Sequence, residues 1–271
     1  MPFYRQNTEL SKIYRGETEL NAIYRGETEL WTKSLGTQGL VLHLDAANET
    51  TGATTWNDLS GNNNNFISTG NVSWNSLNGG VFDFNGGYFN FVRPSDNANN
   101  GLGVFDSQDY TIEAWTYLIT SRLGSFNTPC IWSYDHSSHT PPYYVQQMRH
   151  SYTNNQAWGS TGIGSVPQGT GIQNGWAYTV AVKDLTNSTV GIYQQGQSID
   201  NGTNLASPVE SAPFTNQEVW IGRFGYGDGS GYYTYSGNWG GYMAIIRIWS
   251  RALSSTEILN TYNAERSRFG L

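Results

Sequence analysis

The chain has 271 residues, of which 37% are hydrophobic, 14% are aromatic and only 13% are charged. A disordered chain is poor in aromatic residues, and a coiled coil draws about half of its residues from Ala, Glu, Lys, Leu and Arg, so this composition excludes both classes. The formal net charge of −7 leaves no basic patch that could follow a phosphate backbone, and we expect no nucleic-acid partner.

The residues in excess are Gly, Asn, Thr, Ser, Tyr and Trp, which β-strands and the turns between them use most. An all-β protein is therefore expected. No apolar run reaches the length of a membrane-spanning helix, and the N-terminus lacks the charged and apolar pattern of a signal peptide. We expect neither membrane insertion nor export by the general secretory route. Cys130 is the single cysteine, and we expect it to be a small buried hydrophobic residue.

The N-terminal segment is a repeat with a period of ten: FYRQNTELSK from Phe3, IYRGETELNA from Ile13 and IYRGETELWT from Ile23. Ten residues is not a helical period. Gly16 and Gly26 stand where a tight turn needs a permissive backbone. Each unit is therefore predicted to form a strand, a turn and a second strand.

A segment of this length cannot bury enough apolar surface to fold alone, because chains below about 40 residues usually need a staple or a partner. We assign residues 1–35 to an anchoring or oligomerisation segment and residues 36–271 to a folded domain. A homotrimeric β-prism is the expected geometry, and the alternative is a short hairpin that leans on the following domain. The residues expected to make these contacts are Leu10, Ile13, Tyr14, Leu20, Ile23, Tyr24 and Leu30.

From residue 40 onward, short runs of alternating hydrophobic and polar residues are separated by Asn, Gly and Ser, which is typical of a β-sandwich. One short helix is predicted near the C-terminus, because Ser254 and Glu257 form a capping box. Ile258, Leu259 and Tyr262 then share one helix face. The predicted strands begin near Leu40, Gly80, Tyr110, Cys130, Trp176, Val190, Glu218 and Tyr242.

Six motifs follow one another in this domain: LVLHLDAAN from Leu40, WNDLSGNNNNF from Trp56, FDFNGGYFNF from Phe82, YTIEAWTYL from Tyr110, GGYMAIIRIWSRALSSTEI from Gly240, and the terminal NAERSRFGL. Together they resemble the concanavalin A-like lectin/glucanase superfamily, specifically its laminin-G-like modules. The resemblance implies a curved two-sheet antiparallel jelly roll, whose rim loops bind glycans in relatives, often beside calcium. The IYRGETEL units resemble short repeats that precede such modules in tail and fibre proteins of tailed bacteriophages.

Catalytic carboxylates are the first feature to seek in this superfamily. Its glycanases carry a Glu-x-Asp-x-(x)-Glu run on one strand, since retaining hydrolysis needs a nucleophile and an acid about 5 Å apart. The sequence has no such run, and Glu113 stands alone in its predicted strand. We therefore expect no enzymatic activity and no catalytic residues. Two carboxylates that meet from distant segments remain the alternative.

Calcium is the candidate ion, and no other cofactor is expected. Asp58, Ser60 and Asn62 in WNDLSGNNNN supply the hard oxygen atoms that Ca²⁺ prefers, and the motif is similar to a calcium-binding loop of some family members. Such a site would need a further carboxylate, for which Asp45 and Asp83 are the candidates. The alternative is an Asx-turn that closes the loop without metal.

Two aromatic-rich polar segments, residues 134–158 and 224–242, are the candidate glycan-binding loops. Sugar rings present an apolar C–H face and a polar rim, which suits flat aromatic rings flanked by carboxylate and amide groups. Alternatively, these loops pack on one another or on a neighbouring subunit, because protein interfaces also concentrate Tyr and Trp. The proposed carbohydrate-binding residues are Tyr143, Tyr144, Trp158, Tyr226, Asp228, Tyr232, Tyr233, Tyr235, Asn238 and Trp239.

The resemblance to phage tail and fibre proteins implies a bacteriophage virion protein, and we expect a tail or head fibre or spike adhesin that is assembled in the bacterial cytoplasm. Its expected partners are two further copies of the chain, other virion proteins that contact the repeats, and a host-surface glycan. Two alternatives stay open. One is a decoration protein that stabilises a capsid or baseplate through protein contacts, and the other is a polysaccharide-degrading spike.

Overall fold

The structure is a computed structural model. Outside the short N-terminal strands it describes residues 37–91, 102, 109–122, 129–136, 145–151, 155–160, 169–170, 172, 174–187, 189–203, 217–227, 233–236 and 238–271. Only the backbone is described for the N-terminal strands, for β15–β17, β22 and β23, and for parts of their neighbours.

Each N-terminal repeat forms its own pair of antiparallel strands. Tyr lies opposite Glu and Arg lies opposite Thr in all three pairs, so the ten-residue period of the sequence is the period of the hairpins. The side chains of the Leu, Ile and Tyr columns lie outside the described residues. The pairs are β1 (Tyr4–Arg5) with β2 (Thr8–Glu9), β3 (Ile13–Arg15) with β4 (Thr18–Leu20), and β5 (Ala22–Arg25) with β6 (Thr28–Thr32).

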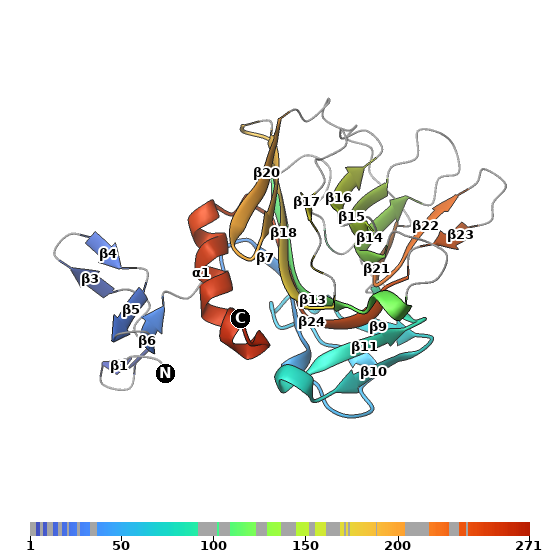
Figure 1. Ribbon diagram of the computed structural model, residues 1–271, viewed down its shortest axis with the longest axis horizontal. Helices are drawn as coiled ribbons and strands as arrows, with labels where there is room; N and C mark the ends of the chain where they lie inside the picture. Colours follow the sequence, from blue (N-terminus) through green and yellow to red (C-terminus); the bar gives the residue numbers. More distant parts are fainter. Residues whose placement is uncertain are drawn as a thin grey trace.

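The rest of the described chain is dominated by two eight-stranded antiparallel sheets (Figure 1), which confirms the predicted jelly-roll sandwich. The first, which we call the helix-covered sheet, has the order β10-β11-β24-β13-β18-β19-β20, with β7 also pairing with β24. Its strands are β7 (Leu40–Asp45), β10 (Val72–Asn75), β11 (Val81–Asn85), β13 (Tyr110–Leu118), β18 (Trp176–Asp184), β19 (Thr189–Gln194), β20 (Gln197–Thr203) and β24 (Gly240–Trp249).

The second sheet, which we call the opposite sheet, has the order β17-β16-β15-β14-β21-β12-β9-β8. A further two-stranded sheet pairs β22 (Phe224–Gly227) with β23 (Tyr233–Ser236). The strands of the opposite sheet are β8 (Thr55–Trp56), β9 (Phe66–Thr69), β12 (Tyr88–Phe91), β14 (Cys130–His136), β15 (Val145–Ser151), β16 (Asn155–Ser160), β17 (Gly169–Thr170) and β21 (Gln217–Ile221).

Strand β13 shows how the core is divided between the two faces of the helix-covered sheet. Tyr110, Ile112 and Ala114 point toward the opposite sheet and join the main core. Trp115, one step out of phase with them, points away and joins a second cluster under the C-terminal helix. Because side chains alternate along a strand, a run that is buried on both faces must be hydrophobic at nearly every position. Cys130 is also buried, as expected.

The C-terminal helix α1 (Ser255–Glu265) covers this second cluster. Ser254 caps the helix through the predicted capping box with Glu257, and Ile258 is fully buried. The short 3-10 helix η4 (Arg266–Phe269) then continues the chain to its end. Three other short 3-10 helices are η1 (Ala46–Asn48), η2 (Leu77–Gly79) and η3 (Thr120–Arg122). In the described part of the chain, no helix has the length and hydropathy that crossing a membrane requires.

The last residues are tied firmly into the domain. The Phe269 ring stacks on Trp115, with centroids 4.1 Å apart, and lies 4.7 Å from the Trp176 ring. Arg268 donates two hydrogen bonds to Asp45 at 2.9 and 3.0 Å. These contacts join the end of the chain to β7, β13 and β18, so the C-terminal segment is part of the fold rather than an appendage.

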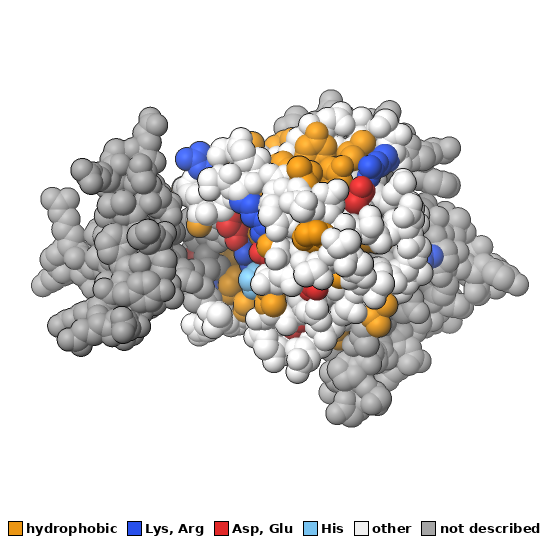
Figure 2. Space-filling model, turned by 90° about the horizontal axis from the view of Figure 1, so that it is seen from below, with side chains coloured by type: hydrophobic (Ala, Val, Ile, Leu, Met, Phe, Trp, Pro, Cys, Tyr) orange, Lys and Arg blue, Asp and Glu red, His pale blue; other side chains and the backbone are white. Residues whose placement is uncertain are grey.

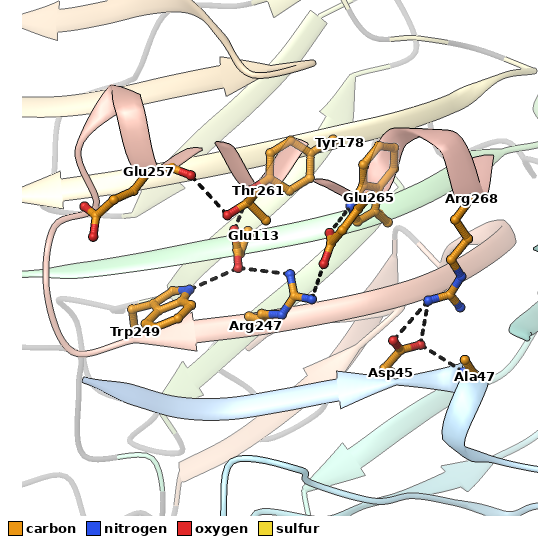
Figure 3. Close-up of polar contacts among 11 residues, drawn as sticks. Asp45, Ala47, Glu113, Tyr178, Arg247, Trp249, Glu257, Thr261, Glu265 and Arg268 are labelled. Atoms are coloured by element: carbon orange, nitrogen blue, oxygen red, sulfur yellow. Dashed lines mark hydrogen bonds and ion pairs between the residues drawn. The ribbon is translucent and has the colours of Figure 1, made fainter. Parts of the chain in front are cut away.

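Figure 2 shows several charged side chains of both signs close to a histidine on this face of the molecule. Polar contacts between β13, β24 and the end of α1 fasten the helix to the sheet (Figure 3). Arg247 on β24 donates to the Glu113 carboxylate at 3.3 Å, and its other amino group pairs with Glu265 at the end of α1. Glu113 also accepts hydrogen bonds from the Tyr178 hydroxyl and the Trp249 indole. We call Glu113, Arg247 and Glu265 the Arg247 clasp.

The clasp changes the pKa values of the groups around it. Burial raises the pKa of Glu113, although the nearby Arg247 opposes this effect. Burial alone would lower the pKa of Arg247, but Glu265 and Glu113 hold it above its ordinary value. His43 lies opposite Arg247 on β7, where burial and the arginine charge lower the pKa of the imidazole to about 4. Its Nε2 is buried without a hydrogen-bond partner.

Replacing Phe269 with alanine should lower the free energy of unfolding by about 3–5 kcal/mol, because the ring fills the space between two tryptophans. Chemical denaturation measures this loss. Leu271→Ala is the matched control: Leu271 is 43% exposed, so this change should cost less than about 0.5 kcal/mol. Equal losses for the two variants would contradict the packing role of Phe269.

The depressed pKa of His43 predicts acid sensitivity. Between pH 6.5 and about 4, the His43 imidazole is protonated in the unfolded chain but stays neutral in the folded chain. The free energy of unfolding therefore falls as the pH falls. His43→Gln should remove this contribution, which is about 2 kcal/mol after allowance for partial exposure. Denaturation of both proteins at pH 7 and pH 4 measures it. Parallel pH profiles for the wild type and the variant would show that the imidazole titrates normally.

Candidate functional site

The predicted glycan-binding residues divide into three groups. Tyr143, Tyr144, Asp228 and Tyr232 lie outside the described residues. The backbones of four others are described within strands, Trp158 in β16, Tyr226 in β22, and Tyr233 and Tyr235 in β23. Side chains are described for Asn238, which is exposed, and for Trp239.

Trp239 is not a surface residue, so this part of the prediction was wrong. Its side chain is 1% exposed and belongs to the core between the two sheets. The backbone N–H of Trp239 donates to Gly222 O at 2.8 Å, which holds the start of β24 beside the end of β21. A tryptophan in a glycine-rich segment looks the same in sequence whether it faces a ligand or fills the core.

A row of aromatic rings crosses the helix-covered sheet on the face that carries α1. Tyr117 on β13 is in register with Trp176 on β18 and with Tyr242 on β24. The ring of Tyr117 lies 5.7 Å from that of Trp176 and 5.8 Å from that of Tyr242. Tyr117 and Tyr242 are partly exposed, whereas Trp176 is 8% exposed. We call these three residues the aromatic row.

The sequence contained only part of this arrangement. Tyr242 ends the predicted segment 224–242, but Tyr117 and Trp176 were assigned to strands and were not proposed as ligand contacts. The three residues are far apart in the chain, and only the strand register brings them together. One feature of the sequence did indicate that Tyr117 could reach a ligand. Tyr117 is on the same strand face as Trp115, and alternation places that face away from the main core.

An ion pair borders the row at the Tyr242 end. Asp83 on β11 is in register with Tyr242, and its carboxylate is paired with Arg122 of η3. The Arg122 guanidinium lies 5.7 Å from the centre of the Tyr242 ring, within cation–π distance. The hydrogen bond to Asp83 raises the pKa of Arg122. Arginine and aspartate therefore neutralise one another at this end.

An exposed asparagine lies beside Tyr117, the middle residue of the row. The Tyr117 hydroxyl donates to Asn174 O at 2.8 Å. The Asn174 side chain hydrogen-bonds Thr120 at 3.1 Å, and Asn174 itself has a φ of 51°, a left-handed conformation that asparagine tolerates better than most residues. These contacts fix the Tyr117 ring and leave amide and hydroxyl groups beside it.

Two glycines allow η3 and β24 to meet at this place. Gly241 has a φ of 142°, and a Cβ atom there would lie 2.1 Å from Tyr117 O. A Cβ atom on Gly240 would lie 2.8 Å from Arg122 Cβ. Larger residues at either position would push apart the strands that carry Tyr117 and Tyr242. The GG pair before Tyr242 is therefore a requirement of this site.

The row has the chemistry of a sugar-contact surface. Its tyrosines combine a flat apolar ring with a hydroxyl group, with a carboxylate and a guanidinium beside Tyr242 and an amide group beside Tyr117. Such a surface can hold a ligand that is apolar on one side and polar at its edge. Its carboxylate, Asp83, is already paired with an arginine, which suits recognition better than proton transfer.

Glu113 does meet a carboxylate from a distant segment, Glu265, as the catalytic alternative required. Arg247 bridges the two, however, and Tyr178 and Trp249 also donate to Glu113. Glu113 is 1% exposed beneath α1. This arrangement holds the helix in place, and α1 covers the Glu113 carboxylate.

The calcium candidates form a closed hydrogen-bonded loop. Asp58 accepts from the backbone of His43 and Ser60 with one carboxylate oxygen, and from the Ser60 hydroxyl and the Asn64 backbone with the other, all at 2.8–2.9 Å. Asn62 donates to Leu40 O and Val41 O. This geometry is that of the Asx-turn alternative.

The carboxylates suggested as calcium partners are used elsewhere. Asp45 pairs with Arg268 and Asp83 pairs with Arg122. Across the residues whose side chains are described, no group of three His, Cys, Asp or Glu residues is placed to hold a metal ion.

Solved structures with the same fold include a sialidase of Trypanosoma rangeli, 16% identical, with a TM-score of 0.59 over 85% of this chain and 33% of that chain. The same sialidase in complex with sialic acid gives 13% identity and a TM-score of 0.59 over the same shares. The receptor-binding domain of a botulinum neurotoxin C/D mosaic serotype is 14% identical, with a TM-score of 0.58 over 83% of this chain and 51% of that chain. This chain thus spans between a third and a half of their lengths.

These likenesses correct the prediction that the domain is not an enzyme. Sialidases process glycans and contain this fold, so the fold and the missing Glu-x-Asp-x-(x)-Glu run do not exclude catalysis. The neurotoxin domain shows that the fold also occurs in a receptor-binding protein. The prediction failed because it rested on the missing glycanase motif and kept hydrolysis only as the alternative.

None of the curated proteins matches the sequence significantly. A family profile does match residues 90–259, more than half of the chain, and these include β13, β24 and the start of α1. The chain therefore belongs to the concanavalin A-like lectin/glucanases superfamily.

Proposed function

We propose that the jelly-roll domain binds carbohydrate and that the aromatic row is its contact surface. The observation that carries this proposal is the alignment of Tyr117 and Tyr242 on neighbouring strands, where both are partly exposed and each has polar groups beside it. Membership of a lectin and glucanase superfamily supports it, as does the fold shared with a sialidase and a toxin receptor-binding domain.

We propose further that the protein is a tail or head fibre or spike adhesin of a bacteriophage virion, with a host-surface glycan as its ligand. The support for this role is the tandem IYRGETEL repeat, in which each unit pairs its own two strands. In this proposal the repeats trimerise the chain and attach it to other virion proteins. The jelly roll then faces outward from the particle.

Replacing either partly exposed tyrosine of the row with alanine should weaken glycan binding about two- to tenfold, because one aromatic contact is worth about 0.5–1.5 kcal/mol. A glycan array followed by calorimetry measures the effect, and the same mixtures report any released sugar. Tyr88→Ala is the matched control, because Tyr88 is a partly exposed tyrosine on the opposite sheet. Loss of binding only in the Tyr88 variant would move the site to that sheet.

The oligomerisation proposal is tested by the solution mass of the full chain beside a chain that begins at Ser34. Light scattering should give a trimer for the full chain and a monomer for the shortened chain, whose folding is checked by circular dichroism. Monomers in both cases would contradict the β-prism. The repeats would then be a docking segment for a larger assembly, as a decoration protein also requires.

A further inference from the structure

We infer that the ligand of the aromatic row is an uncharged linear oligosaccharide that lies across the strands and places two consecutive sugar rings on Tyr242 and Tyr117. This inference rests on the proposed carbohydrate-binding function and gives it a ligand class. It follows from the direction of the row and from the pairing of the charges beside it.

The direction of the row sets the direction of the ligand. Tyr242 and Tyr117 are cross-strand neighbours on β24 and β13, so the line between their rings runs perpendicular to the strands. Neighbouring strands are about 4.8 Å apart, and the two ring centres are 5.8 Å apart, with ring planes inclined by 57°. Two sugars stacked on them must therefore be turned relative to one another. A single sugar ring covers one tyrosine, whereas an extended chain of sugars can place successive rings on both.

Each tyrosine has its own polar neighbours. At the Tyr242 end, Asp83 and Arg122 offer an acceptor and donors. Beside Tyr117, the amide of Asn174 and the hydroxyl of Thr120 offer both. Hydroxyl groups of two adjacent sugars can therefore be bound separately. This arrangement divides the surface into two subsites, each consisting of one ring and one polar pair.

The paired charges beside the row disfavour an acidic ligand. Arg122 at one end is paired with Asp83. Arg268, whose guanidinium lies 5.2 Å from the Phe269 ring that packs on Trp176, is paired with both oxygens of Asp45. A sugar carboxylate would have to displace an aspartate from its arginine, in a chain whose net charge is already −7. Neutral hydroxyl groups face no such competition.

Stacking on Trp176 is not required of the ligand. Trp176 is 8% exposed, its indole N–H donates to Asn78, and its ring meets Tyr117 edge to face. It packs beside the Tyr117 ring on the neighbouring strand, and its burial leaves the two tyrosines as the rings that sugars can cover. Longer chains should therefore gain little beyond the second sugar.

Calorimetry on the full-length protein tests the inference with cello-, malto-, xylo- and manno-oligosaccharides of one to six units, preceded by a glycan array that holds neutral and acidic bacterial oligosaccharides. In the series that binds, the disaccharide should bind at least tenfold more tightly than the monosaccharide, with less than threefold further gain up to six units. Raising the salt concentration from 50 to 300 mM should change the affinity less than twofold. Acidic oligogalacturonates of equal length should bind at least tenfold more weakly.

Variants locate the two subsites. Tyr117→Ala and Tyr242→Ala should each reduce disaccharide affinity to that of the monosaccharide, while Tyr242→Phe, which keeps the ring, should retain most of the length dependence. Thermal unfolding confirms that each variant is folded. Equal affinity for one and two sugars, or preference for acidic chains, would overturn this inference while the proposed function stands. Absence of binding to any sugar would overturn both.

Discussion

The Arg247 clasp is the interaction on which the outer layer of this domain depends. A guanidinium and two carboxylates lose water when they are buried, and their attraction compensates only if the remaining polar atoms are also satisfied. Here the two carboxylates receive the guanidinium, the Tyr178 hydroxyl and the indole N–H groups of Trp249 and Trp115. Their geometry specifies where the end of α1 lies on the sheet, because a shifted helix would leave Arg247 facing a single carboxylate.

The position of the helix is transmitted to the aromatic row through contiguous ring contacts. Trp115 donates its indole N–H to Glu265 and stacks on Phe269, with ring planes 19° apart. Phe269 packs on Trp176, and Trp176 meets Tyr117 edge to face. The clasp and the candidate ligand surface are thus two ends of one packed layer. A change that loosens the C-terminal segment should therefore also alter the orientation of Tyr117.

The sequence predicted best those features that depend on residues close together in the chain. The capping box at Ser254 and the ten-residue hairpins followed from spacing alone, since each depends on residues close in sequence. The sandwich followed from the alternation along its short strands and from the resemblance of six motifs to a known superfamily, because its sheets pair strands far apart in the chain. The burial of Trp239 and the contacts within the aromatic row depend on strand register, which no short motif records. The loop at Asp58 shows a third case. Carboxylate and amide side chains that could hold calcium also satisfy backbone donors, and the sequence left both alternatives open.

A β-bulge decides which way Tyr242 faces. Along β24, Ile248 and Ile246 point into the core between the sheets, and strict alternation would direct Ala244 and Tyr242 inward as well. The register shifts instead, because Trp115 pairs with Ile245 and Thr116 pairs with Met243, so that Ala244 is the extra residue. Met243 then joins the core and Tyr242 turns outward beside Tyr117. A one-residue irregularity next to Gly240 and Gly241 therefore places the second ring of the candidate site on the surface, as bulges beside functional sites commonly do.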